Sequence, residues 1–396
     1  MYNNNFKNQE VGIIYPILPK NCYSSVLNYI KDLELSINKV NIFVDIQNIA
    51  SVHNNLELYY KETNFPEIFN QILYEVVSIV ESFKMINLLP HVIIYTDNKR
   101  NIYNTNLYHD WKSNRKKNLM DDNITEKDKL TYESSVVLKE LLSLSLKSLS
   151  KLFNNSKRLS IIELENIDSD FIPALVKSLI NDETCLNLIV STDHDYIHMI
   201  NNKNTVRYSR VHKKFYENFP VLETLYTKNI FLKEKEDIKD LEIAKKIAKY
   251  YQIFHGLAGD STDNVKPIIP KKGLKKWAKE LEFNNENTDI IVDKILRREY
   301  KIFEDDVNNT ELIKRILMFD FNVMSKLFMY YLLDKSEYQY LIDLMLSLAP
   351  QNLNVIKDNV EIVKKILFVP RQKIENFDIF INTFHIKDEY INSLFY

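Results

Sequence analysis

Two pairs of closely spaced aspartates have the residue type and spacing needed to bind a cation. Asp193 and Asp195 follow the apolar run 186–190, and carboxylates at i and i+2 on a strand-to-helix turn can converge on one ion. Asp260 and Asp263 form an i, i+3 pair, which faces one way if a helix starts at Asp260. Hard cations such as Mg²⁺ prefer oxygen ligands, so both pairs predict divalent-ion chemistry.

The second pair lies in a stretch of unusual composition. The chain has only four glycines, and three of them fall within residues 256–273. After Asp263, the lysines that precede the next acid are Lys266, Lys271, Lys272, Lys275, Lys276 and Lys279. Such a run suits contact with nucleic-acid phosphates. A plain helix cap at Asp263 is the alternative interpretation.

Other aspartates end predicted strands. The apolar runs 41–45 and 91–97 end in Asp45 and Asp97, and residues 65–89 between them have apolar positions at helical spacing. Parallel strands joined by such a crossover place ligand sites at their carboxyl ends. For Asp45 alone, a cap of the following helix is the alternative. The pattern predicts an α/β protein with a mostly parallel sheet.

Two more strands extend this edge. Residues 158–164 precede Asp168 and Asp170, and residues 186–190 precede the Asp193 pair. Two unit charges about 6 Å apart repel by about 3 kcal/mol at an effective dielectric constant of about 20. A cluster of carboxylates therefore requires cations or protonation. Oxygen-only ligands favour Mg²⁺ or Mn²⁺ over zinc.

A basic segment follows Asp97. Between residues 98 and 119 the basic residues are Lys99, Arg100, Lys112, Arg115, Lys116 and Lys117, against one acid, Asp110. Tyr103, Tyr108 and Trp111 lie among them. Cations with interleaved rings are typical of grooves for single-stranded nucleic acid, where the rings stack on bases. The alternative is an ordinary solvated basic helix face.

Composition restricts the class of protein. The 396 residues are 45% hydrophobic with a net charge of -2, so the chain is globular and nucleic acid must be bound by local basic clusters. Cys22 and Cys185 have no partner at metal-binding spacing, which argues against a disulfide framework or zinc site. No apolar run reaches bilayer length, and the N-terminus lacks signal-peptide features. We expect a cytoplasmic protein without a membrane partner, in the host cytoplasm if it is viral.

Three motifs occur along the chain in a recognisable order. They are Tyr108-His-Asp-Trp-Lys112-Ser-Asn-Arg115, Ser191-Thr-Asp-His-Asp195, and Gly259-Asp-Ser-Thr-Asp-Asn264 with its lysines. Together they resemble the 5′-nuclease family of flap endonucleases, polymerase-associated 5′ to 3′ exonucleases and phage RNase H-type enzymes. The first is similar to the family's Y-K-x-x-R signature. The resemblance covers residues 41–300.

The resemblance implies a fold and a division of the chain. The fold is a PIN-like, mostly parallel sheet flanked by helices, with a helical arch. The implied segments are an N-terminal extension (1–40), a nuclease core (41–235, arch about 98–155), a helix-hairpin-helix-like DNA-binding region (236–300) and a helical C-terminal region (301–396).

Residue roles follow from the same resemblance. It implies that Lys112 and Arg115 contact the scissile phosphate. It assigns the first of two Mg²⁺ or Mn²⁺ ions to Asp45, Asp97, Asp168, Asp170 and Asp193, and the second to Asp195, Asp260 and Asp263, partly through water. The implied DNA-binding residues are Lys99, Arg100, Lys116, Lys117, Lys266, Lys271, Lys272, Gly273, Lys275 and Lys276.

The chain departs from the family pattern at two places. Where the family has E-A-D-D, this chain has Asp168-Ser-Asp170-Phe171, so one carboxylate is replaced by a ring. Glu165 is a weak candidate substitute. The glycine-rich loop that holds a monovalent ion in many members is here rich in proline and lysine, so that ion site is lost or altered.

The expected function is metal-dependent hydrolysis of phosphodiesters at 5′ flaps, RNA primers or duplex 5′ ends in DNA replication and repair. The expected partners are branched or 5′-ended DNA and RNA/DNA hybrids. The tail Ser393–Tyr396 resembles sliding-clamp-binding peptides, with packing on its own domain as the alternative. Two other functions stay open: a DNA-structure-binding replication accessory with little catalysis, and a PIN-type ribonuclease.

Overall fold

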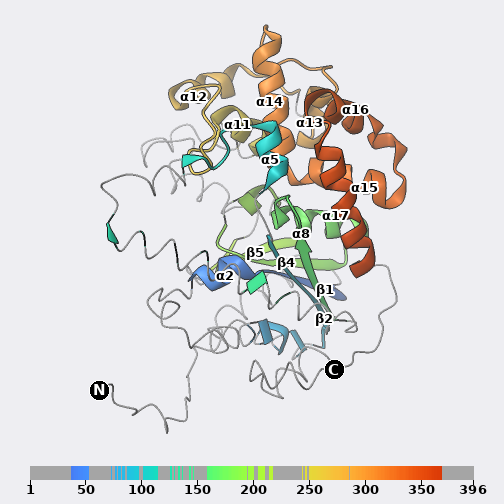
Figure 1. The fold of residues 1–396 in the computed structure, drawn as a ribbon. Coiled ribbons are helices and arrows are strands. Elements are labelled where there is room, and N and C mark those ends of the chain that lie inside the picture. Colours follow the sequence, from blue (N-terminus) through green and yellow to red (C-terminus); the bar gives the residue numbers. More distant parts are fainter. Residues whose placement is uncertain are drawn as a thin grey trace.

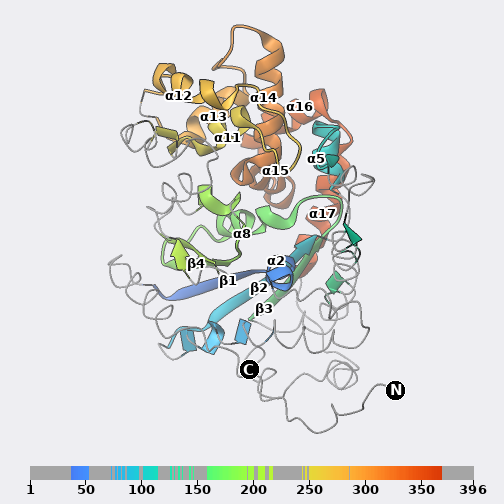
Figure 2. The same cartoon turned by 90° about the vertical axis from the view of Figure 1, so that its left-hand side faces the viewer.

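A six-stranded sheet forms the centre of the protein (Figure 2). The structure is a computed structural model. It describes residues 37–52, 87–97, 101–114, 158–193, 195–199, 204–209, 214–216, 249–284 and 286–367, with single positions in 73–84, 125–146 and 243–247. The strands are β1 (Lys39–Asp45), β2 (Pro90–Asp97), β3 (Leu159–Leu164), β4 (Cys185–Val190), β5 (Thr205–Ser209) and β6 (Lys214–Tyr216).

The sheet has the order β3-β2-β1-β4-β5-β6. The first five strands in this order are parallel, and β6 pairs with β5 in the antiparallel direction. This confirms the predicted α/β class with a mostly parallel sheet, whereas the antiparallel edge strand was not predicted. The central strands β1 and β4 are apolar and buried on both faces, as parallel strands covered by helices require.

The register brings the strand ends to one edge. Asp45 of β1 lies opposite Tyr95 of β2, and Val44 lies opposite Val190 of β4. Asp97 therefore ends β2 two residues beyond the end of β1, and the residues after Val190 emerge beside Asp45. All the strand-terminal aspartates named above leave the sheet on this side.

Helices cover the sheet and extend beyond this edge (Figure 1). In chain order they are α2 (Ile46–Val52), α5 (Ile102–Leu107), the 3₁₀ turn η1 (Ser169–Phe171), α8 (Ile172–Ile180), the 3₁₀ turn η2 (Asp195–Met199), α11 (Tyr251–Ala258), α12 (Lys271–Glu280), α13 (Thr288–Leu296), α14 (Asp306–Phe319), α15 (Phe321–Leu333), η4 (Ser336–Tyr338), α16 (Gln339–Leu348) and α17 (Asn352–Leu367). No single described helix is long and apolar enough to span a membrane, although α14 and α15 together, bent by 75° at their junction, have the length and composition.

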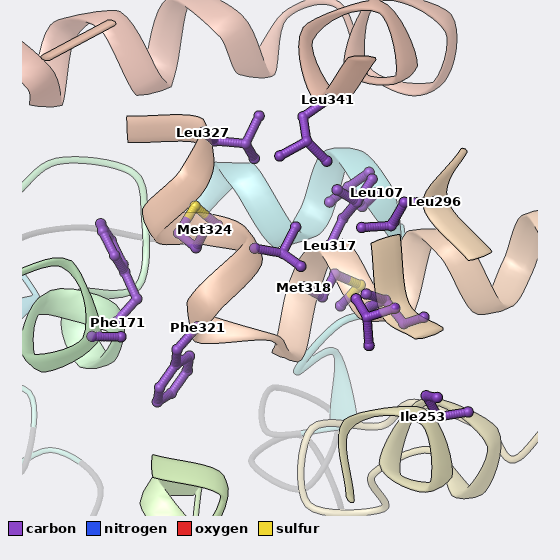
Figure 3. Close-up of a cluster of buried hydrophobic side chains, with 14 of the residues drawn as sticks. Leu107, Phe171, Ile253, Leu296, Leu317, Met318, Phe321, Met324, Leu327 and Leu341 are labelled. Atoms are coloured by element: carbon purple, nitrogen blue, oxygen red, sulfur yellow. The ribbon is translucent and has the colours of Figure 1, made fainter. Parts of the chain in front are cut away.

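Among the helices after residue 300, α15 packs against α8 and α17 packs against β3. Phe171, at the start of α8, is buried and its ring lies 4.7 Å from that of Phe328 on α15. Figure 3 shows Phe171 on the side of α15, which carries Phe321 and Leu327, and Leu341 on α16. The apolar core therefore runs without interruption from the sheet edge into the C-terminal helices.

Several predicted segments lie outside the described residues. They are residues 1–36, the basic positions Lys99, Arg100, Arg115, Lys116 and Lys117, and the C-terminal residues Ser393–Tyr396. Clamp binding by the tail and the roles of these basic residues stay predictions.

Helix α17 is joined to the end of β3 by one amide side chain. Asn359 is buried, and its Nδ2 donates to the carbonyl oxygen of Glu165 at 2.7 Å while its Oδ1 accepts from the Glu165 N–H at 2.8 Å. A single side chain thus satisfies both backbone groups at the point where the chain leaves the sheet.

We expect Asn359→Ala to destabilise the protein. The change removes both hydrogen bonds to the backbone of Glu165, and each such bond contributes about 0.5–1.5 kcal/mol. The free energy of unfolding, measured with urea, should fall by roughly 1–3 kcal/mol. Asn354→Ala, on the exposed face of the same helix, should change it little. Equal stability of the two variants would contradict this account of the contact.

Candidate functional site

Six carboxylates and one lysine line a single cavity at the carboxyl edge of the sheet. The cavity has a volume of about 530 Å³. Its charged lining residues include Lys112, Asp168, Asp170, Asp193, Asp195, Asp260 and Asp263. Three separate stretches of the chain supply these carboxylates. The structure therefore brings together six of the eight aspartates predicted as metal ligands, with one of the two predicted phosphate-contacting residues among them.

The other two predicted aspartates, Asp45 and Asp97, end the neighbouring strands. Asp45 is buried, and its carboxylate accepts from the Asn48 N–H at 2.9 Å and the Ser191 hydroxyl at 3.0 Å. Asp97 accepts from both the N–H and the hydroxyl of Ser169, at 2.7 and 2.8 Å. Neither is among the lining residues of the cavity, but the charge of each raises the pKa of Asp170.

The turn after β4 is fixed by its own polar groups. The Asp193 carboxylate accepts from the Asp195 N–H at 3.0 Å, and the Asp193 N–H donates to Ser191 Oγ at 3.0 Å. The buried Arg207 guanidinium donates to the Asp193 carbonyl oxygen. Because Ser191 also donates to Asp45, this turn and the end of β1 are held as one unit.

Asp260 and Asp263 lie on a turn, not on the helix face considered from their spacing. Asp260 Oδ1 accepts from the Thr262 N–H at 2.7 Å and from the Asp263 N–H at 3.4 Å. The next helix, α12, begins only at Lys271. Gly259 has φ +66°, and a Cβ there would lie 2.4 Å from the Val265 carbonyl oxygen. Glycine is therefore required where the chain turns back on itself.

Lys112 projects its charge among these carboxylates. Its Nζ lies 3.6 Å from Asp263 Oδ2 and 4.0 Å from Asp168 Oδ2. Its backbone has φ +53°, and its N–H donates to the Asp263 carbonyl oxygen at 2.7 Å. The neighbouring Trp111 donates its indole N–H to Asp263 Oδ2 at 3.2 Å. The lysine is thus held at the wall of the cavity through the backbone of the acidic turn.

The segments 108–114 and 259–267 are tied together along their length. The Asn264 side chain donates to the Asp110 carbonyl oxygen at 3.0 Å and to Ser113 Oγ at 2.7 Å. Asn114 donates to the Ser261 carbonyl oxygen at 3.3 Å. Together with the Lys112 contacts, these bonds make one braced unit of the basic segment and the acidic turn.

The aromatic residues of the basic segment are not arranged as predicted. Tyr103 is fully buried and donates its hydroxyl to the Leu317 carbonyl oxygen at 3.2 Å, and Trp111 is only 7% exposed. Neither ring is available to stack on a base, so that prediction is wrong for both. Tyr108 is partly exposed, and its hydroxyl accepts from the Lys266 N–H at 3.3 Å.

Burial and like charges raise the pKa of three of the aspartates. Burial, followed by the charges of Asp193 and Asp97, raises the pKa of Asp45 to about 7. Burial and then Asp168 raise the pKa of Asp170, and burial and then Asp193 raise that of Asp195.

Asp260 shifts in the opposite direction. Burial alone would raise its pKa, but its interaction with His255 and the backbone N–H groups of Thr262 and Asp263 lowers it. His255 Nε2 lies 3.9 Å from Asp260 Oδ2. One carboxylate of the cavity is therefore held in its ionised form by protein groups alone.

The donor set fits divalent oxygen-preferring cations. The acidic residues that line the cavity offer only carboxylate oxygens, and a cation between them would relieve the repulsion that raises their pKa values. No three acidic, histidine or cysteine side chains within the described ranges converge into a finished protein-only ligand group. Mg²⁺ commonly binds through one or two carboxylates and keeps several waters, so this arrangement suits Mg²⁺ or Mn²⁺ better than zinc.

Phe171 occupies the place where the family resemblance implies a further carboxylate. Phe171 is 2% exposed and belongs to the core, so it cannot face the cavity. Glu165 is not among the residues that line the cavity, and its backbone N–H and carbonyl groups are bonded to Asn359. The acidic set at this position is reduced to Asp168 and Asp170.

The predicted DNA-binding lysines lie on and before α12. Lys266 and Lys276 are exposed. Lys276 Nζ lies 3.7 Å from Oε1 of Glu280, one helical turn later. Lys271, Lys272 and Lys275 belong to the same helix, which also contains Gly273. A Cβ at position 273 would approach Ile269 Cγ2 to 2.9 Å, so the close packing of the preceding loop favours this glycine.

Several cavity residues were not predicted. Asn48, Tyr251 and His255 line it, and Tyr196 donates to Asp170 at 2.8 Å. Asn48 had a local signal, since it stands three residues after Asp45 in a cap position. The contact of Tyr196 with Asp170 spans 26 residues and carries no such signal, and His255 was missed although it stands just before Asp260.

No protein-family model and no curated protein sequence matches the chain. Solved structures do match, each over 82% of this chain and 99% of the other. They are a bacteriophage T5 flap endonuclease pseudo-enzyme–product complex with DNA and metal ions (15% identity, TM-score 0.46), a T5 protein co-crystallised with metal ions (16%, 0.45) and T5 5′-exonuclease with bound zinc (16%, 0.44). The function must rest on the residues of the cavity.

We expect the metal-free protein to lose stability as the pH rises. Asp45 has a pKa of about 7 in the folded protein, above the value of about 3.9 of an unfolded aspartate. Its contribution is therefore present below about pH 4 and lost between about pH 4 and 7. With a chelator present, the free energy of unfolding should be lower at pH 8 than at pH 5, and millimolar Mn²⁺ should restore it.

Asp320→Asn is a control for this experiment. Asp320 caps α15, and burial raises its pKa to about 7 as well, but it does not line the cavity. In Asp320→Asn, the free energy of unfolding should vary less with pH than in the wild type, and Mn²⁺ should still raise it by the wild-type amount. In Asp45→Asn, the free energy of unfolding should also vary less with pH, and Mn²⁺ should raise it by less than in the wild type. A metal response unchanged in Asp45→Asn would contradict the electrostatic coupling described.

Proposed function

We propose that this protein is a metal-dependent 5′-nuclease that hydrolyses phosphodiesters at 5′ flaps, RNA primers or duplex 5′ ends during DNA replication or repair. The observation that supports it is the convergence of six carboxylates and Lys112 on one cavity at the carboxyl edge of a parallel sheet. A structural role does not explain why so many like charges are gathered where burial opposes ionisation.

Two Mg²⁺ or Mn²⁺ ions would be held by the aspartates of the cavity, with Asp45 and Asp97 behind them. When bound, such ions lower the pKa of water and stabilise charge on phosphate oxygens. The residues of the chain supply position: hydrogen bonds from Ser191, Ser169 and Asn48 fix the carboxylates, and the buried strand ends hold them at one edge.

Lys112 would orient the scissile phosphate. Its ammonium group already stands between Asp168 and Asp263, so an anionic group entering the cavity meets a cation at its wall. A lysine binds phosphate as a point charge and stabilises negative charge that develops in the transition state. Arg115, predicted to act with it, lies outside the described residues.

The lysines of α12 and Lys266 would bind the duplex beside the cavity. What supports this is the short connection, since α12 begins at Lys271, soon after the turn that carries Asp260 and Asp263. Phosphate contacts of this kind position a nucleic acid without reading its sequence.

The second candidate is a replication accessory that binds branched DNA and cleaves it little. The burial of Phe171 favours it, because a ring in the core stands where the family resemblance implies a carboxylate. The two functions differ in cleavage: a nuclease that binds metal and DNA cleaves the flap, whereas the accessory binds both and leaves the flap intact.

We expect Asp193→Asn to reduce cleavage of a labelled 5′-flap DNA in Mg²⁺ or Mn²⁺ by on the order of 100-fold or more, since it removes one charge from the centre of the acidic set. Asp358→Asn, on the exposed face of α17, should cleave at the wild-type rate. Binding of the flap without cleavage by the wild-type protein would favour the accessory.

Lys112 and the α12 lysines should affect different steps. Lys112→Ala should slow single-turnover cleavage by about 100-fold with little change in flap affinity. Changing Lys271, Lys272, Lys275 and Lys276 together to alanine should mainly weaken binding, and the slope of log K against log salt should fall by up to about four. Filter binding and single-turnover kinetics on both variants check this division, and equal loss of both properties in both variants would contradict it.

A further inference from the structure

Two buried tyrosine hydroxyls form a chain that ends on a cavity carboxylate. Tyr196 Oη donates to Asp170 Oδ1 at 2.8 Å, and the hydroxyls of Tyr95 and Tyr196 are 2.5 Å apart. Both tyrosines are 0% exposed. The proposed chemistry of the cavity assigns a role to Asp170 and none to the two tyrosines.

The donors in this chain have one consistent direction. A phenol has one O–H donor, and an ionised carboxylate only accepts. When Asp170 is ionised, the Tyr196 hydroxyl therefore donates its hydrogen bond to the carboxylate, and its oxygen is left to accept from Tyr95. The second tyrosine thus fixes the rotation of the first hydroxyl.

The chain is anchored on two sides. Tyr95 lies on β2 directly opposite Asp45 in the parallel register. The ring of Tyr196 meets Phe321, the first residue of α15, edge-on at 5.8 Å. Phe171, the neighbour of Asp170, packs on Phe328 of the same helix, and Figure 3 shows Phe171 and Phe321 on this side of α15. The core thus sets both the backbone and the hydrogen-bond donor of Asp170.

We propose that Tyr196, backed by Tyr95, is a positioning residue that holds the Asp170 carboxylate in the orientation needed to bind a divalent cation. This inference rests on the proposed function, because it concerns the same acidic site. The residue after Asp170 is a core phenylalanine, so Asp170 has no acidic neighbour on its C-terminal side to share an ion with. Its orientation must then be set by a neutral donor, which adds no further repulsion to the cavity.

The test removes single hydroxyl groups and measures metal binding to the free protein. Tyr196→Phe and Tyr95→Phe keep the rings and their packing. Tyr103→Phe is the matched control, because Tyr103 is equally buried and donates to a backbone carbonyl away from the cavity. Isothermal titration with Mn²⁺, without DNA, gives the affinity, and urea unfolding gives the stability of each variant.

We expect Tyr196→Phe to weaken Mn²⁺ binding by about 10- to 100-fold, as loss of a group that orients a ligand does. Tyr95→Phe should weaken it less, and Tyr103→Phe should leave it unchanged. Flap cleavage by Tyr196→Phe should fall at low Mn²⁺ and recover at saturating Mn²⁺. A purely structural role would lower stability in all three variants without this metal dependence.

The outcomes separate this inference from the proposed function. Wild-type Mn²⁺ affinity in Tyr196→Phe overturns the inference, even if the wild-type protein cleaves flaps. Weakened Mn²⁺ binding in Tyr196→Phe supports it, even if the wild-type protein cleaves nothing and the proposed function fails. Absence of Mn²⁺ binding to the wild-type protein overturns both.

Discussion

Repulsion among carboxylates gathered at and beside one cavity, at the carboxyl edge of the sheet, is the constraint on which this structure depends. Burial and like charge both oppose ionisation of Asp45, Asp170 and Asp195, yet the fold keeps them together. It does so with rigid supports: parallel strands that end at one edge, hydroxyl and backbone N–H donors to Asp45, Asp97 and Asp170, and an apolar layer behind them. The stability given up at this edge is explained if cations occupy it.

The C-terminal helices contribute to that support. Helix α15 contacts the rings of both Phe171 and Tyr196, which neighbour the acidic residues Asp170 and Asp195 in the chain. Helix α17 fixes the backbone at the end of β3 through Asn359. The helices after residue 300 therefore carry no cavity residue of their own but determine where the cavity residues stand.

Much of the fold could be predicted from the sequence because its signals are local. Apolar runs that end in aspartate mark parallel strands, and parallel strands leave their carboxyl ends at one edge, so Asp45, Asp97 and Asp193 were placed together. The turn at Asp260 was less predictable, since an i, i+3 spacing fits both a helix and a hydrogen-bonded turn. The burial of Trp111 and the Tyr196 contact depend on residues distant in the chain, which periodicity does not report.

The braced unit of residues 108–114 and 259–267 has an energetic consequence. The two segments share hydrogen bonds through Lys112, Asn114, Asp263 and Asn264, so neither can relax while the other stays in place. If one substitution is made in each segment, the loss of unfolding free energy in the double variant will differ from the sum of the two single losses. The reason is that the first substitution loosens the segment on which the second acts. Lys112 and the acidic turn therefore form one energetically coupled unit, although about 150 residues of chain separate them.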